Sequence, residues 1–394
     1  MASPPEQKTS AKGLTYQLRL PDNYAKGKHP LVVGLHGAGG TCANFMQWMS
    51  SPQATFPKDA ILLAPQALKN GAWDKEDTEP LADLVREMKA AHTPVRTIGF
   101  GFSRGAYYTF HLGTTYPELY DGAIPFAGGL PGSVPDSEDM RRLPFYVLHG
   151  DADDVVPITE SERSVKALEA AKVTVKFEKI AGLKHTVDWA GVKRGLDWIG
   201  GILDERQKAL DDEVAKKIAE LEKSLKEKSW EAAAAGFGAI TRVPAKLAPK
   251  VAALAKAHVL SPEESLAFAA IAAAGRCGAD GVAALKGIPG TNEKFATAAA
   301  TALGVTGAPA AVEPLFAYLK TKSDTVAMAA AAALAVLGGD AATGALVAGL
   351  SNCEALLPAS PRKGGILEAL NRNTGQSFAK ASEWKKWLAE KGKK

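Results

Sequence analysis

Short apolar segments alternate with amphipathic ones along the first half of the chain. Residues 31–35 form a continuous apolar run, which predicts a strand buried on both faces, and residues 14–20 alternate apolar with polar positions, which predicts a half-buried strand. Strands that alternate with helices predict an α/β fold, a mostly parallel sheet with helices on both faces. Further strands are expected at 60–64, 97–102, 122–127, 144–148 and 173–180, and helices directly after residue 102 and at 81–91, 160–171 and 186–202.

The pattern changes at about Asp204. Apolar residues then recur every three or four positions among many Lys and Glu residues, at Leu210, Val214, Ile218, Leu221 and Leu225. This spacing predicts an amphipathic helix. Near residue 261 the chain becomes rich in Ala, with short apolar helices broken by Gly. The expected organisation is a disordered tail at 1–12, an α/β domain at 13–204, a helical connector at 205–260 and an Ala-rich helical domain at 261–394.

A weak internal repeat runs through the Ala-rich part. Residues 302–315 align with residues 333–346, and residues 271–285 form a looser copy. Paired helices that recur at a period of about thirty residues predict an α-solenoid, and they resemble short HEAT repeats. Residues 370–378, with the Trp residues that follow, resemble the closing segment of some bacterial HEAT-repeat proteins. An Ala-rich helical bundle without repeats is the alternative.

Composition and charge argue against several classes of protein. The net charge of +4 is too small to indicate nucleic-acid or anionic-membrane binding. The three cysteines are widely spaced and form no CxxC or Cys/His cluster, so we expect neither a zinc site nor a disulfide framework. The mechanism expected below implies no metal and no organic cofactor. No apolar run is long enough to span a membrane, and the polar start has no signal-peptide core. We therefore expect a soluble protein, either cytoplasmic or exported with its signal peptide absent from this sequence.

The first candidate for chemistry lies at residues 97–106. The predicted strand ends in the pattern Gly-x-Ser-x-Gly, with the serine at Ser103, and a helical pattern follows. Strand, sharp turn and helix are the context of a nucleophile elbow, in which small flanking residues leave the serine hydroxyl exposed. Such a short pattern also arises by chance, so it needs a base, an acid and an oxyanion hole elsewhere in the chain.

The chain order Ser, acid, His limits the other members of a catalytic triad. Of the seven histidines, His149, His185 and His258 follow the serine. His149 ends a strand and His258 lies in the helical region, whereas His185 lies in a loop after the last strand and is the best candidate for the base. The acid should lie between serine and base. The loop after residues 144–148 offers three carboxylates, which position alone does not separate: Asp151, Asp153 and Asp154.

Three segments carry a family resemblance. They are Gly101-Phe-Ser-Arg-Gly-Ala106, His149-Gly-Asp-Ala-Asp-Asp-Val-Val-Pro157 and Gly182-Leu-Lys-His185. In order and spacing they are similar to the elbow, acid loop and base loop of the α/β-hydrolase superfamily, in particular its phospholipase/carboxylesterase and dienelactone hydrolase group. The resemblance covers about residues 13–203 and implies an α/β-hydrolase fold there, followed by the all-α HEAT-like domain. It implies a triad of Ser103, Asp153 and His185, with Arg104 where the family has Gln.

An oxyanion hole requires backbone N–H groups aimed at the developing negative charge. One donor is the residue after the nucleophile, Arg104, and the other should come from the glycine-rich loop at residues 36–40, which follows a buried strand. The resemblance assigns that second donor to Ala38. A phosphate-binding loop is the alternative for residues 36–40, but no Lys-Ser or Lys-Thr pair follows them.

Apolar loop residues beside the expected site are the candidates for substrate binding: Met46, Trp48, Trp73, Leu130, Val155 and Val156. Because no long cap is inserted between strands and motifs, we expect an open, shallow cleft for esters with accessible carbonyls. The resulting expectation is a serine esterase that works through an acyl-enzyme. Polyester, feruloyl-carbohydrate and acetyl-carbohydrate esterases, thioesterases and peptidases on the same fold are alternatives.

The helical half leaves a non-enzymatic hypothesis open. HEAT-like arrays usually present a concave protein-binding face, so the chain could be a scaffold protein with a vestigial hydrolase domain. The repeats also suggest a protein partner for an active enzyme. Because every expected triad and oxyanion residue is present, we favour the enzyme.

Overall fold

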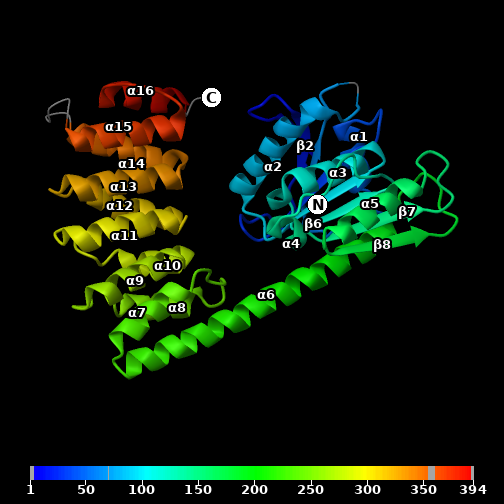
Figure 1. The fold of residues 1–394 in the computed structure, drawn as a ribbon. Coiled ribbons are helices and arrows are strands. Elements are labelled where there is room, and N and C mark those ends of the chain that lie inside the picture. The colour runs from blue at the N-terminus through cyan, green and yellow to red at the C-terminus, as the bar shows by residue number, and fades with distance from the viewer. Residues whose placement is uncertain (1–3, 70, 354–359, 392–394) are drawn as a thin grey trace. The chain divides into compact units, whose positions relative to one another are not determined.

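The computed structural model describes residues 4–69, 71–353 and 360–391 (Figure 1). The chain divides into two compact units, one ending at Arg206 and the other starting at Gln207. The first unit holds the sheet and the second is entirely helical.

The first unit is built on an eight-stranded sheet with the strand order β1-β2-β4-β3-β5-β6-β7-β8. The pairs β1–β2 and β2–β4 are antiparallel and all other pairs are parallel, as expected for an α/β-hydrolase fold. The strands are β1 Glu6–Thr9, β2 Thr15–Arg19, β3 Leu31–Leu35, β4 Ile61–Pro65, β5 Thr97–Phe102, β6 Gly122–Phe126, β7 Phe145–Gly150 and β8 Val175–Ile180.

Helices cover both faces of this sheet (Figure 1). Val33 and Leu35 pack with α2, α3, α4 and α5, whereas Val32 packs with α1 and the start of α6. Successive residues of a strand point to opposite faces, so burial on both faces explains the continuous apolar run at 31–35. The helices are α1 Cys42–Met49, α2 Thr78–His92, α3 Arg104–Thr115, α4 Glu138–Arg142, α5 Thr159–Ala170 and α6 Trp189–Lys226, with short 3₁₀ turns η1 Lys75–Asp77 and η2 Pro117–Leu119.

The expectation of a disordered tail at residues 1–12 is wrong for the part that the structure describes. Residues 1–3 lie outside that part, but Glu6–Thr9 form strand β1, which pairs with β2 at the edge of the sheet. All four side chains of β1 are exposed. The strand is held by backbone pairing rather than by burial, so the hydrophobic pattern carries no sign of it.

The helix expected at residues 186–202 does not end there. It is the first part of α6, which continues without a break through the amphipathic segment expected to begin a separate connector at residue 205. Further along, Phe237 and Val251 join the same hydrophobic core as the Ala-rich helices. Residues 207–260 therefore pack as part of the helical unit.

The helical unit is a stack of paired helices (Figure 1). Helices α7, α9, α11, α13 and α15 contact one another in succession, helices α8, α10, α12 and α14 pack against them, and α16 packs against α14. Close packing depends on small residues: a Cβ at Gly304 would lie 2.9 Å from that of Ala333 in the next helix pair. The bounds are α7 Trp230–Ala239, α8 Ala248–Lys256, α9 Glu264–Gly275, α10 Gly278–Leu285, α11 Glu293–Val305, η3 Pro309–Ala311, α12 Val312–Leu319, α13 Asp324–Leu337, α14 Gly339–Asn352, α15 Pro361–Thr374 and α16 Ala381–Lys391.

The last helix closes the hydrophobic core of this unit. Trp384 is fully buried, and its indole N–H donates to the Phe378 carbonyl at 3.1 Å. Its ring also packs edge-on against the rings of Phe378 and Trp387. The aromatic residues that suggested a closing segment in the sequence thus surround the end of the core.

Candidate active site

The expected site residues lie in loops at one edge of the sheet. Ser103 follows β5, Asp153 follows β7, His185 follows β8, and the loop that contains Ala38 follows β3. These strands are parallel, so their carboxyl ends meet at the same edge, where ligands bind in open α/β sheets. Residues far apart in the sequence are thereby brought together.

Ser103 occupies a strained turn between β5 and α3. Its backbone has φ 55° and ψ −122°, a conformation that non-glycine residues rarely adopt. A Cβ at Gly101 would lie 2.2 Å from the Gly105 carbonyl oxygen, and one at Gly105 would lie 2.0 Å from the Leu35 carbonyl oxygen. Both flanking positions therefore require glycine, as the nucleophile-elbow interpretation predicts.

The structure brings Ser103, His185 and Asp153 into a hydrogen-bonded chain. The Nε2 atom of His185 lies 3.0 Å from Ser103 Oγ, and its Nδ1 atom lies 2.8 Å from Asp153 Oδ2. A carboxylate only accepts hydrogen bonds, so the proton of neutral His185 resides on Nδ1 and Nε2 is free to accept the serine proton. The His185 side chain is 16% exposed, whereas that of Asp153 is fully buried.

The environment of Asp153 keeps its carboxylate ionised. Oδ1 accepts the backbone N–H groups of Val155 and Val156, each at 2.9 Å. Burial alone would raise the pKa of Asp153, but the hydrogen bonds from His185 and these two amides hold it below its usual value. An ionised acid at this position stabilises a positively charged His185.

The other two carboxylates of this loop do not contact His185 in the part of the chain that the structure describes. Asp151 accepts the backbone N–H of Gly182 at 2.7 Å and so ties the acid loop to the loop that carries His185. Asp154 is exposed. Of the three carboxylates that sequence position left open, Asp153 is the one that hydrogen-bonds His185 in the described part of the chain.

A second histidine, which the sequence marked only as structural, lies against the acid. His149 is fully buried, with Nε2 located 2.9 Å from the Val156 carbonyl oxygen and 3.4 Å from Asp153 Oδ2. Its Nδ1 lies 2.7 Å from Ser161 Oγ. Burial lowers the pKa of His149 and favours its neutral form. His149 thus contacts the acid loop at the Val156 carbonyl and at the same Asp153 oxygen that His185 contacts.

The loop that is expected to supply an oxyanion donor, and that contains Ala38, is held in place by His36. The Nδ1–H of His36 donates to the Gly37 carbonyl at 2.8 Å, and its Nε2 accepts the backbone N–H of Ala67 at 3.2 Å. These partners require the neutral ring, and burial lowers the pKa of His36 in the same direction. Ala38 is exposed at the tip of this loop, and Arg104 is the first residue of α3, where backbone N–H groups lack a helical partner.

The side chain of Arg104 has a structural explanation that the sequence does not provide. Its Nε–H donates to the backbone carbonyl of Trp73 at 2.9 Å, and the Trp73 indole N–H donates to the carbonyl of His36 at 2.8 Å. Arg104 therefore links the turn at the serine to the oxyanion loop, through a residue far from both in the sequence.

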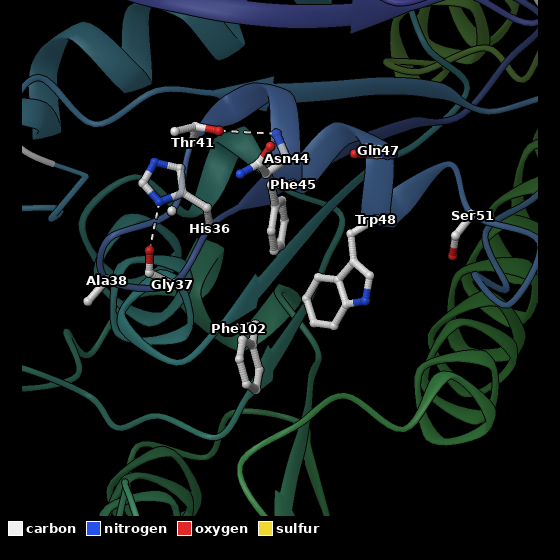
Figure 2. Close-up of a pocket in the computed structure, with 11 residues that line it drawn as sticks. His36, Gly37, Ala38, Thr41, Asn44, Phe45, Gln47, Trp48, Ser51 and Phe102 are labelled. Atoms are coloured by element: carbon white, nitrogen blue, oxygen red, sulfur yellow. Dashed lines mark hydrogen bonds between the residues drawn. The ribbon is translucent and has the colours of Figure 1, made fainter.

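Only part of the expected substrate-binding set reaches a pocket. Trp48 and Ala38 line a pocket of about 520 Å³ (Figure 2). Met46 and Trp73 are 1% and 0% exposed and pack in the two hydrophobic cores of the unit, as does Leu130 at 6%. None of these three residues belongs to the lining of the pocket beside Ala38. Val156 is buried and serves the acid loop through its backbone, whereas Val155 is 63% exposed.

The sequence missed most of the pocket lining because it treated residues 42–49 as a loop. They form helix α1, whose N-cap Thr41 accepts the backbone N–H of Asn44 at 3.1 Å. One face of α1 packs on the sheet and the other faces the pocket. The residues that line the pocket are His36, Gly37, Ala38, Gly40, Thr41, Asn44, Phe45, Gln47, Trp48, Ser51 and Phe102.

Among the described residues, no group of three or more His, Cys, Asp and Glu side chains is arranged to hold a metal ion. The cysteines are buried as free thiols, including Cys42 at the start of α1. In the described part of the chain, no helix is both long and apolar enough to cross a membrane.

Comparison with protein families assigns both halves of the chain. Residues 59–199 match the phospholipase/carboxylesterase family, and residues 282–357 match HEAT repeats. The chain therefore combines an α/β-hydrolase domain of the phospholipase/carboxylesterase type with a HEAT-repeat region, as the resemblance implied.

Similar curated proteins match the hydrolase half at low identity. A probable inactive carboxylesterase of Oryza sativa subsp. japonica is 25% identical over 126 residues, which are 31% of this chain and 51% of the relative. Poly(3-hydroxyalkanoate) depolymerase C of Paucimonas lemoignei is 30% identical over 115 residues, 25% of this chain and 28% of the depolymerase. Acyl-protein thioesterase 1 of Emericella nidulans is 27% identical over 113 residues, 27% of this chain and 47% of the thioesterase. The chain thus spans about half of these relatives or less.

Similar solved structures cover the same half. A thermostable esterase superposes with a TM-score of 0.41 at 22% identity, covering 50% of this chain and 62% of the esterase. The Bacillus cereus carboxylesterase superposes with a TM-score of 0.38 at 19% identity, covering 48% of this chain and 94% of that chain.

Proposed function

We propose that this domain of the phospholipase/carboxylesterase type is a serine hydrolase that cleaves carboxylic esters through an acyl-enzyme. The observation that carries the proposal is the hydrogen-bonded chain from Ser103 through His185 to the buried Asp153. Ser103 is the nucleophile, His185 the general base and acid, and Asp153 the acid that orients His185. The strained turn at Ser103 supports the proposal, because strain of this kind persists where function requires it.

The reaction follows from these positions. As Ser103 Oγ attacks the ester carbonyl carbon, its proton moves to Nε2 of His185. The backbone N–H groups of Arg104 and Ala38 donate to the resulting oxyanion. When the tetrahedral intermediate collapses, the C–O bond to the alcohol breaks and His185 returns the proton to the departing oxygen. Water then attacks the acyl-enzyme by the same route, releasing the carboxylic acid and restoring Ser103.

The alternatives differ in the leaving group rather than in the catalytic groups. The depolymerase and thioesterase among the relatives make polymeric esters and thioesters natural members of a substrate panel. Feruloyl and acetyl sugars and peptides complete that panel. One relative is named a probable inactive carboxylesterase, so a scaffold protein with a vestigial hydrolase domain is the non-enzymatic alternative. An intact Ser-His-Asp arrangement favours the enzyme.

Covalent labelling with a fluorophosphonate tests the proposal without a substrate. We expect Ser103 Oγ to attack phosphorus, expelling fluoride and forming one O–P bond, because His185 activates this hydroxyl. Mass spectrometry of digested protein should locate a single phosphonyl group on the peptide that contains Ser103. The variant His185→Ala should label at least about a hundredfold more slowly. Equal labelling of both proteins, or modification of another residue alone, would contradict the proposal and favour the scaffold.

A further inference from the structure

The pocket lined by Trp48 begins at the oxyanion loop and so adjoins Ser103. Gly37 and Ala38 form one end of its lining, and a Cβ at Gly37 would lie only 3.4 Å from that of Ser103. Its volume of about 520 Å³ lies within the range of about 300–1,000 Å³ typical of ligand sites. An ester whose carbonyl oxygen points to the Ala38 and Arg104 amides therefore places one of its two substituents in this pocket.

One wall of the pocket is a fixed group of aromatic rings. The Trp48 indole makes edge-on contacts with Phe45 and Phe102, each with ring centres 5.5 Å apart, and with Trp189 at 5.1 Å. Phe102 in turn lies 4.8 Å from the ring of His185. Trp48 is thus held from three sides, and the aromatic surface extends from the pocket to the proposed base.

The opposite wall is glycine-rich backbone. Figure 2 shows Gly37 and Ala38 on one side of the pocket and the rings of Phe102 and Trp48 on the other. Since Gly37 and Gly40 have no side chains, they present backbone atoms to the pocket. Exposed polar residues of α1 lie at its rim, including Asn44 and Gln47. We refer to this pocket, which lies between glycine-rich backbone and aromatic rings, as the slot.

We infer that this slot selects esters that carry an aromatic ring on the acyl or on the alcohol side. The inference rests on the proposed esterase function and names its substrate class. A planar ring gains offset-stacked or edge-to-face contacts with Trp48 and Phe102 that an alkyl chain does not. A rigid ring also loses less conformational freedom on binding than a chain with many rotatable bonds.

Two pairs of esters with equal carbon numbers test the inference. Methyl 3-phenylpropanoate and methyl nonanoate differ in the acyl group, and 2-phenylethyl acetate and octyl acetate differ in the alcohol, so that within each pair the carbonyl is unconjugated and the leaving group is an alkanol. We expect kcat/KM to favour the aromatic member of at least one pair by about tenfold, and that pair identifies the side of the ester that enters the slot. In Trp48→Ala, and in Trp48→Leu if the alanine variant folds poorly, this preference should fall to about twofold or less.

The control variant is Trp198→Ala, which removes an aromatic ring of the same unit that packs on Tyr146 instead of the pocket. It should keep the wild-type preference. The inference is wrong if wild type cleaves the alkyl member of both pairs as well as the aromatic one, or if the Trp48 variants keep the full preference. It is also wrong if neither aromatic ester is cleaved while fluorophosphonate still labels Ser103. Absence of both labelling and turnover would instead refute the proposed function.

Discussion

Replacing Ser103 by Ala should lower kcat for p-nitrophenyl acetate by about 10⁴-fold or more relative to wild type. The change removes the hydroxyl that we propose receives the acyl group, while leaving His185, Asp153 and the loop that contains Ala38 in position. The Ser103 hydroxyl contacts His185 Nε2 at 3.0 Å, and the variant retains the backbone that forms the turn. Steady-state release of p-nitrophenol by both proteins measures the effect.

A companion variant separates loss of chemistry from loss of fold. Ser103→Gly also lacks the hydroxyl, but glycine adopts φ 55° without the steric cost that serine and alanine bear. Its free energy of unfolding should therefore exceed that of Ser103→Ala by about 1 kcal/mol, and both variants should be inactive. If either variant kept more than a tenth of wild-type turnover, Ser103 would not be the nucleophile.

Asp153→Asn should lower kcat by about 10³- to 10⁴-fold at neutral pH. The Asn oxygen would keep the hydrogen bonds from Val155 and Val156, which leaves its NH₂ group facing His185 Nδ1. Because that group donates, Nδ1 must accept, and the ring proton moves to Nε2, where it blocks removal of the Ser103 proton. The charge that stabilises protonated His185 is lost as well. The matched control is Asp154→Asn, which changes an exposed carboxylate of the same loop and should stay within about twofold of wild type.

The same substitution has a signature in stability at acid pH. Since the folded-state pKa of Asp153 lies below its usual value, its ionised form stabilises the folded protein above the unfolded-state pKa of about 3.9. That contribution disappears as pH falls through the lower folded-state value. The wild-type protein should therefore lose stability more steeply than Asp153→Asn below about pH 4, as measured by urea unfolding. Parallel pH profiles would show that the carboxylate is not held as the geometry implies.

Much of the sheet could be predicted because its strands carry a strong signal. Strands such as β3 and β5 are buried on both faces and read as apolar runs bounded by turns. Strand β1 could not be predicted, since it contributes backbone pairing and buries none of its side chains. The length of α6 was also missed, because the change of composition near Asp204 marks where the packing partner changes rather than where the helix ends.

The candidate site, too, could be predicted from the sequence only in part. Short sequence patterns locate Ser103 and His185, because a turn between strand and helix and a loop after a strand have local signatures. The chain of contacts from Arg104 through Trp73 to His36 has none, since it joins residues from separate loops. Which residues line the pocket depends on how helix α1 is rotated about its own axis. Within α1, Trp48 faces the pocket, whereas Met46 is buried in the core. Treating that segment as a loop left the two indistinguishable.

The proposed function depends on transfer of an acyl group to Ser103, and this acyl-enzyme can be trapped. Wild-type protein mixed with excess p-nitrophenyl acetate and quenched in acid within the first turnovers should carry one acetyl group. After digestion, mass spectrometry should find that group on the peptide that contains Ser103, with none in Ser103→Ala treated alike. Rapid p-nitrophenol release without an acetylated Ser103 peptide, or the same acetylated peptide fraction in both proteins, would contradict the proposed mechanism.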